Sequence, residues 1–193
     1  MSTANPLADL LAGLAAAFAA LGRRWYLFGA QAVVVWGKPR ASADVDVTVE
    51  AAPEDSAELV QALATAGFEL RLTRGVEEFV ARARVLPFLH PGSGIPVDVV
   101  LAGPGLEERF LDGAVPVDIG GVSVPVLSAE DLVVTKILAG RPKDLEDVRG
   151  VLAERIDALD LAAIRSTLGE LEAALGQSDL LPLFEAEAER ARG

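Results

Sequence analysis

The chain has 193 residues, 51% of them hydrophobic, so it can bury a sizeable core as one domain or as a core with a small appended lobe. It contains no cysteine, which excludes disulfides, zinc–thiolate sites, iron–sulfur clusters and a thiol nucleophile, and which suits a cytoplasmic protein. The net charge of −12 argues against a broad nucleic-acid-binding surface, although it leaves room for a local basic groove.

The first part of the chain alternates helical and β-prone segments. Residues 6–21 predict an alanine-rich amphipathic helix, which Asp9 interrupts, so this segment does not resemble a signal peptide. No apolar stretch reaches the length that crosses a membrane, and no membrane partner is expected. The following elements are predicted in chain order: a strand at 25–28, a short helix at 30–36, a strand at 43–50, a helix at 53–66, a strand pair at 68–72 and 78–85, a loop at 87–94, a strand at 95–101, and a hairpin of 115–119 with 122–126.

The character of the chain changes after Leu127. Residues 128–131 resemble a capping box that opens a helix. Helices are then predicted at about 129–139, 143–154, 160–174 and 179–191. The sequence therefore predicts an α/β (α+β) fold, with a mixed sheet and flanking helices in residues 1–127 and a helical bundle in residues 128–193.

Three aspartates on two predicted strands are the main candidate site. Asp44 and Asp46 lie two residues apart, so both point to one face of their strand, about 6.5–7 Å apart along it. At ~5 Å and an effective dielectric constant of ~20, two ionised carboxylates repel each other by on the order of 3 kcal/mol, which a shared divalent cation relieves. Asp98 interrupts an apolar strand and is costly to bury alone, unless its strand lies beside the first and shares the cation. These oxygen ligands fit Mg²⁺ with substrate phosphates, whereas the solvated face of an edge strand is the plain alternative for Asp44 and Asp46.

Gly29 ends the first predicted strand and precedes a short helix. Backbone N–H groups at the N-terminus of a helix attract phosphate, and a glycine lets the phosphate come close. The strand–glycine–helix unit is therefore expected to hold a triphosphate, and the next strand is expected to hold the metal.

Two blocks of the sequence resemble the DNA polymerase β-like nucleotidyltransferase superfamily, and in particular its minimal bacterial, AbiEii-like members of toxin–antitoxin and abortive-infection systems. The first block is Gly29-Ala30-Gln31-Ala32 followed by the segment from Arg40 to Val47. The second block covers residues 128–148, with a lysine on one helix and Lys-Asp-x-x-Asp on the next. Together the resemblance covers most of residues 25–155.

The resemblance implies a nucleotidyltransferase core that moves a nucleotidyl group from a Mg²⁺-bound nucleoside triphosphate to an acceptor hydroxyl. It implies that Asp44, Asp46 and Asp98 bind the metal and carry the catalysis, and that Asp98 also activates the nucleophile. It further implies that Lys143 and Asp144 help Asp147 to complete the site. It also implies nucleotide-binding roles for Lys136 and Asp147. The other candidate nucleotide-binding residues follow from their position at the start of the short helix or just before the acidic strand: Gly29, Ala30, Gln31, Arg40 and Ser42.

Several of these residues also have ordinary structural interpretations. Lys136 could be a surface lysine of a helix, and Asp144 and Asp147 could be first-turn acids that complement a helix dipole. Arg40 could pair with a surface acid. Positive charge is concentrated in one stretch, and some of these side chains would share a face if the predicted strands pair: Arg71, Arg74, Arg82 and Arg84.

The acceptor stays open on the sequence. A small molecule such as a cationic aminoglycoside would suit an acidic protein, whereas RNA is what the toxin resemblance suggests. Ala30 departs from the family, which has glycine or serine there, and its side chain cannot offer a hydroxyl to the phosphates. A non-catalytic module that binds a nucleotide or a partner protein is therefore the third interpretation.

Overall fold

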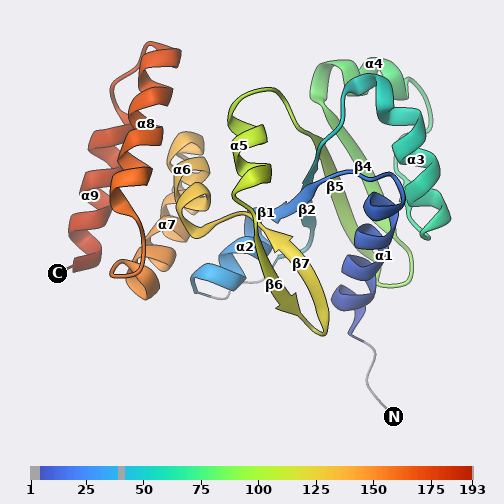
Figure 1. Ribbon diagram of the computed structural model, residues 1–193, viewed down its shortest axis with the longest axis horizontal. Helices are drawn as coiled ribbons and strands as arrows, with labels where there is room; N and C mark the ends of the chain where they lie inside the picture. Colours follow the sequence, from blue (N-terminus) through green and yellow to red (C-terminus); the bar gives the residue numbers. More distant parts are fainter. Residues whose placement is uncertain (1–4, 39–41, 193) are drawn as a thin grey trace. The chain divides into compact units, whose positions relative to one another are not determined.

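The computed structural model describes residues 5–38 and 42–192, and it divides into two compact units (Figure 1). The first unit comprises Met1–Ala30 and Ser42–Leu127, and the second comprises Gln31–Ala41 and Ser128–Gly193. The second unit therefore takes up a short segment from the first part of the chain in addition to the C-terminal helices.

A seven-stranded mixed sheet forms the centre of the first unit, in the order β3-β4-β5-β2-β1-β7-β6. In its middle, β2 runs parallel to β5 and antiparallel to β1. The valines of β2 are fully buried on one face, because side chains alternate along a strand. The strands are β1 (Trp25–Phe28), β2 (Val45–Val49), β3 (Glu69–Leu70), β4 (Val85–His90), β5 (Ile95–Leu101), β6 (Val115–Ile119) and β7 (Val122–Val126).

Helices of the first unit pack around this sheet. Asn5 caps the first of them by accepting hydrogen bonds from the N–H groups of Leu7 and Ala8, at 3.2 and 3.4 Å. The helices are α1 (Pro6–Ala20), η1 (Pro53–Asp55), α3 (Ser56–Thr65), α4 (Val76–Ala83) and α5 (Leu106–Asp112). A further helix, α2 (Gly29–Trp36), starts in the first unit and continues into the second.

The segment around α4 differs from the sequence prediction. Residues 78–85 were expected to form a strand, but residues 76–83 form a helix, and part of the predicted loop 87–94 belongs to β4. The less exposed side chains of α4 are Val76, Phe79 and Val80, which follow helical spacing, and Glu77 and Glu78 complement its N-terminal dipole. The strand prediction was therefore wrong here, and α5 was missed.

The second unit is helical. Its C-terminal helices are α6 (Ala129–Ala139), α7 (Pro142–Arg155), α8 (Leu161–Leu175) and α9 (Leu180–Arg192), in close agreement with the four predicted from sequence. Ser128 caps α6, because its hydroxyl accepts from the N–H of Asp131 at 3.0 Å. Buried apolar side chains such as Val148, Ile164 and Phe184 fill the space between the helices. The predicted mixed α/β (α+β) architecture with a helical C-terminal part is confirmed.

Candidate active site

Asp46 and Asp98 lie opposite each other on neighbouring strands. The parallel pairing of β2 with β5 places Asp46 in register with Asp98, so both residues belong to the same face of the sheet. Asp44 comes directly before β2, two residues from Asp46. The sequence predicted a shared site only if the strand of Asp98 lies beside the strand of Asp44 and Asp46. The structure meets this condition.

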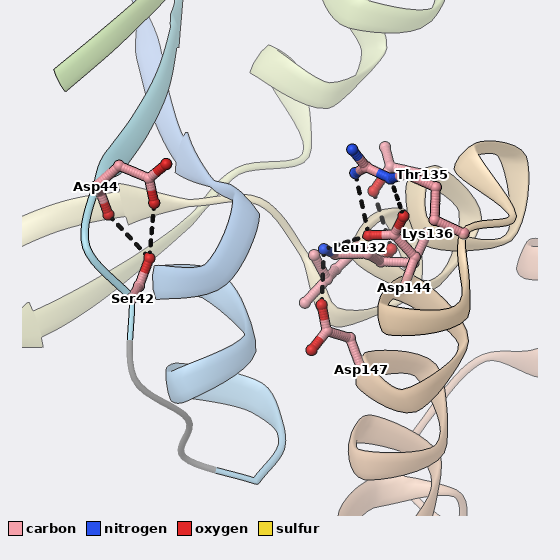
Figure 2. A network of polar contacts seen from close by, with 8 residues as sticks. Ser42, Asp44, Leu132, Thr135, Lys136, Asp144 and Asp147 are labelled. Atoms are coloured by element: carbon pink, nitrogen blue, oxygen red, sulfur yellow. Dashed lines mark hydrogen bonds and ion pairs between the residues drawn. The ribbon is translucent and has the colours of Figure 1, made fainter. Parts of the chain in front are cut away.

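Asp44 and Asp98 each have a side-chain partner. The hydroxyl of Ser42 donates to the Asp44 carboxylate at 2.8 Å and lies 3.1 Å from the Asp44 carbonyl oxygen, as the left part of Figure 2 shows. Asp98 Oδ1 lies 4.0 Å from the guanidinium of Arg71, and both side chains are about half exposed. A pair this exposed contributes little to stability, so Asp98 stays accessible to solvent and to a substrate.

Gly29 forms a close contact with Asp46. A Cβ atom at position 29 would lie 2.1 Å from Asp46 Oδ2, which is far inside the contact distance of any real side chain. The backbone of Gly29 also has a φ of +64°, a conformation that residues with a side chain rarely adopt. The carboxylate of Asp46 therefore sits against the first turn of α2, and only glycine provides both the space and the backbone conformation.

The donor chemistry of the three aspartates fits Mg²⁺, which prefers carboxylate oxygens together with phosphates and water. As the side chains stand, no group of three or more His, Cys, Asp or Glu in residues 5–38 and 42–192 is placed to hold a metal ion. The backbone positions are neighbours, while Asp44 is turned to Ser42 and Asp98 to Arg71. Bringing the three carboxylates around one ion therefore requires rotation of side chains and no rearrangement of the strands.

Within the second unit, Lys136 joins two buried carboxylates. Its ammonium lies 2.9 Å from Asp144 Oδ1 and 2.8 Å from Asp147 Oδ2 (right part of Figure 2). Lys136 is 8% exposed and Asp144 is fully buried, so a surface lysine is the wrong description. Burial raises the pKa of the Asp144 carboxyl, but hydrogen bonds from Arg141 and Lys136 outweigh this effect and hold the pKa below its ordinary value.

This cluster ties α6 to α7. Two of the three N–H donors of the Lys136 ammonium are directed to the carboxylates of Asp144 and Asp147. The phosphate contact that the family resemblance implies for Lys136 stays a prediction, as does the role of Asp147. Lys143, on the same helix, is exposed.

The remaining predicted nucleotide-binding residues lie around α2. Ala30 is buried in the first turn of the helix, next to Gly29, and Gln31 follows it as the first residue of the second unit. Arg40 lies outside the described residues. The roles of these residues toward a nucleotide stay predictions.

The arginines do not form the basic face that paired strands would have given them. Arg82 lies on α4, and Arg84 ends that helix with its guanidinium bonded to backbone carbonyl oxygens, including that of Leu101 at 3.1 Å. Arg71 alone of the set approaches the aspartates. Sequence spacing gave no signal for that approach, because it arises from the order of β3, β4 and β5 in the sheet.

A mixed sheet with two aspartates in register, beside a glycine that opens a helix, is the arrangement of a nucleotidyltransferase-like protein. The chain belongs to the family described as nucleotidyltransferase of unknown function (DUF6036), whose sequence profile matches residues 21–178. The superfamily resemblance is thereby confirmed, whereas the AbiEii-like subgroup stays a prediction. No curated protein sequence matches the chain.

Several solved structures share the fold. The antibiotic-resistance factor ANT(2'')-Ia is 17% identical, with a TM-score of 0.58 over 88% of this chain and 95% of that one. An antigenic nucleotidyltransferase-like protein from Paracoccidioides brasiliensis is 18% identical, with a TM-score of 0.58 over 94% of this chain and 93% of its own. The complex of ANT(2'')-Ia with adenylyl-2''-tobramycin is 16% identical, with a TM-score of 0.54 over 96% and 99% of the two chains. At these identities the likeness establishes the fold.

In the described part of the chain, none of the helices has the length and hydrophobicity that a membrane crossing needs.

Proposed function

We propose that the protein transfers a nucleotidyl group from a nucleoside triphosphate to an acceptor hydroxyl with the help of Mg²⁺. The observation that carries the proposal is the register of Asp46 with Asp98, next to the glycine that opens α2. Membership of a nucleotidyltransferase family supports the same conclusion.

Mg²⁺ would be held by Asp44, Asp46 and Asp98, and when bound it neutralises phosphate charge and orients the leaving group. The acceptor oxygen attacks the α-phosphorus, the bond to pyrophosphate breaks, and the hydroxyl proton passes to the Asp98 carboxylate. Because Asp98 is about half exposed, it can release that proton to solvent. The absence of a side chain at position 29 lets the Asp46 carboxylate lie against the first turn of α2, whose backbone N–H groups are proposed to bind the phosphates.

The other residues bind and position. Gln31, Arg40 and Ser42 are proposed to hydrogen-bond the nucleotide, and Ser42 meanwhile fixes the carboxylate of Asp44. Lys136 is proposed to contact phosphate with its third donor, since Asp144 and Asp147 occupy the other two.

A small molecule and a macromolecule are both candidate acceptors. Among proteins of the same fold, ANT(2'')-Ia is an antibiotic-resistance factor, which favours a small-molecule hydroxyl. The AbiEii-like resemblance favours RNA or protein, in a toxin–antitoxin setting. The net charge of −12 disfavours RNA.

A non-catalytic nucleotide- or partner-binding module is the second candidate function. One observation favours it: Ala30 offers no hydroxyl to the phosphates. Such a module would bind a nucleotide or a partner without releasing pyrophosphate.

The test is calorimetric titration of each of the four nucleoside triphosphates with Mg²⁺ present and with Mg²⁺ removed by chelation. We expect Mg²⁺-dependent binding to the wild type and its loss in Asp46→Asn. Asp9→Asn changes an exposed acid of α1 in the same unit and should bind as the wild type does. Binding of no triphosphate, or equal binding by Asp46→Asn, would contradict the proposed site.

Pyrophosphate release separates the two candidate functions. The preferred triphosphate is incubated with candidate acceptors, including an aminoglycoside and a short RNA, and pyrophosphate is measured. Release that depends on acceptor and on Asp98 supports the transferase. Mg²⁺-dependent binding without release for any acceptor supports the module.

A further inference from the structure

A cavity of about 600 Å³ lies within the second unit, and its lining includes Lys143 and Asp147, which the family resemblance associates with the nucleotide site. Its walls come from α7, α9 and the end of α2, and its size falls in the range of small-molecule sites, about 300–1,000 Å³. Val33, Gly150 and Ala153 supply apolar surface. Cationic side chains surround this surface: Lys38, Lys143, Arg149 and Arg190.

Two glycines bring the end of α2 against α7. A Cβ at Gly37 would lie 2.9 Å from the backbone nitrogen of Val151, and one at Gly150 would lie 3.4 Å from the backbone nitrogen of Lys38. Arg155 strengthens this contact, because its guanidinium donates to the Trp36 carbonyl oxygen at 2.8 Å and stacks 4.9 Å from the Trp36 ring. The packing therefore fixes the backbone of Lys38 at the rim of the cavity.

The two arginines of the cavity share one buried carboxylate. Glu187, which is 1% exposed, accepts a bidentate hydrogen bond from Arg149 at 2.7 and 2.9 Å. Arg190 donates to the same carboxylate at 2.7 Å. This network joins α7 to α9 as a fixed wall, and because two guanidinium groups face one carboxylate, it keeps a net positive charge at the cavity.

The two lysines add further positive charge. Within the part of the chain that the structure describes, neither Lys38 nor Lys143 forms an ion pair. Two acids also line the cavity: the Asp147 carboxylate is directed to Lys136 at 2.8 Å, and the exposed Glu146 offsets one of the four positive charges. In a protein with a net charge of −12, two unpaired lysines beside apolar surface make a local anion site.

We propose that this cavity binds an organic phosphate, with the phosphate between Lys38 and Lys143 and the apolar body against Val33 and Ala153. Lysine ammonium groups are compact charges that suit phosphate, whereas the planar fork of Arg149, which could recognise a carboxylate, is occupied by Glu187. The proposal holds whether or not the protein transfers nucleotides, because it does not involve Asp44, Asp46 or Asp98.

The test uses phenyl phosphate, benzoate and inorganic phosphate as probes of the full chain, followed by nitrogen–proton correlation spectra. We expect phenyl phosphate to shift the backbone amides of Lys38, Gly150 and Ala153, with tighter binding than either other probe. Tighter binding of benzoate would overturn the assignment to phosphate, and equal binding of inorganic phosphate would overturn the role of the apolar surface.

Variants locate the binding. Lys38→Ala/Lys143→Ala should weaken phenyl phosphate binding by at least about tenfold. Arg82→Ala, which removes an exposed charge on α4, should leave it unchanged. Ala153→Trp keeps every charge and fills the cavity, so it should also abolish binding. The proposal is overturned if the folded lysine variant and Ala153→Trp both bind as the wild type does.

Failure here is distinguishable from failure of the proposed transferase function. Asp46→Asn should lose triphosphate binding and keep phenyl phosphate binding. Loss of both in Asp46→Asn, with the variant folded, would show that the probe occupies the triphosphate site and would overturn the separate cavity site.

Discussion

At the scale of single residues, Gly29 is the most tightly constrained position of the candidate site. Its φ of +64° costs a residue with a side chain about 1–2 kcal/mol, and a Cβ there would displace the Asp46 carboxylate. We expect Gly29→Ala to lower the unfolding free energy by at least this amount and to abolish Mg²⁺-dependent triphosphate binding.

Gly67→Ala is the matched control for this prediction. Gly67 also has a positive φ, of +90°, but a Cβ there would meet nothing within 4 Å. The control should therefore lose stability in thermal unfolding and keep triphosphate binding. If both variants bind equally well, the contact of Gly29 with Asp46 has no functional role.

Lys136 is the second constrained residue. Replacing it by methionine leaves Asp144 and Asp147 buried without their ammonium partner, and breaking a buried pair in this way costs about 3–5 kcal/mol. We expect Lys136→Met to lose stability on this scale in urea unfolding. Lys143→Met, at an exposed position on α7, should change the unfolding free energy by less than about 0.5 kcal/mol. A small effect of Lys136→Met would mean that Arg141 alone compensates the carboxylates.

At the scale of elements, two glycines lie at the contact between α2 and α7, and they differ in the space available for a side chain. A Cβ at Gly37 would lie 2.9 Å from backbone, so Gly37→Ala forces the helices apart and should cost about 1–3 kcal/mol. Gly150 lies inside α7 and has ordinary contact distances, so Gly150→Ala should be neutral or stabilise by up to about 1 kcal/mol. Chemical unfolding of both variants measures the difference, and equal losses would refute this account of the contact.

Elements with a sustained hydrophobic period could be predicted from sequence, whereas a short stretch with an ambiguous pattern could not. The valines of β2 and the apolar spacing of α6 to α9 carry a clear period, and these elements are where they were expected. The stretch from Ala81 to Val85 alternates apolar and charged residues, which is typical of a strand, but the helix that begins after Gly75 runs through Ala83. In such a segment, packing against distant parts of the chain determines whether a helix or a strand forms.

The candidate site, too, could be predicted from sequence only in part. The neighbouring positions of Asp46 and Asp98 followed from strand patterns, because Asp98 in an apolar strand needed a partner strand beside it. The burial of Lys136 and the approach of Arg71 to Asp98 depend on which helices and strands pack together, and sequence spacing carries no signal for that.

At the scale of the molecule, buried carboxylates make stability depend on pH. The hydrogen bond from Arg149 lowers the pKa of Glu187 against the opposing effect of burial, and the pKa of Asp144 is lowered as well. Both contributions are complete above the ordinary pKa values of 4.5 and 3.8, and they are lost as the pH falls through the lower folded-state pKa values.

We therefore expect the urea midpoint of the helical unit to be constant near neutral pH and to fall steeply below about pH 4. Glu187→Gln cannot be protonated, so it should be less stable at pH 7 and show a shallower decline in acid. The decline can be followed by helical circular dichroism. An equally steep decline in Glu187→Gln would assign the acid sensitivity to other groups.

The division of the chain has a consequence for inheritance. The polypeptide passes between the two units after Ala30, after Ala41 and after Leu127, so neither unit is a contiguous stretch of sequence. A gene fragment that ends at Leu127 carries residues 31–41 without the helices that they belong with, and the complementary fragment lacks them. Exchanging only the segment after Leu127 between relatives therefore does not exchange the whole helical unit. A recombinant that replaces this unit must also replace the end of α2.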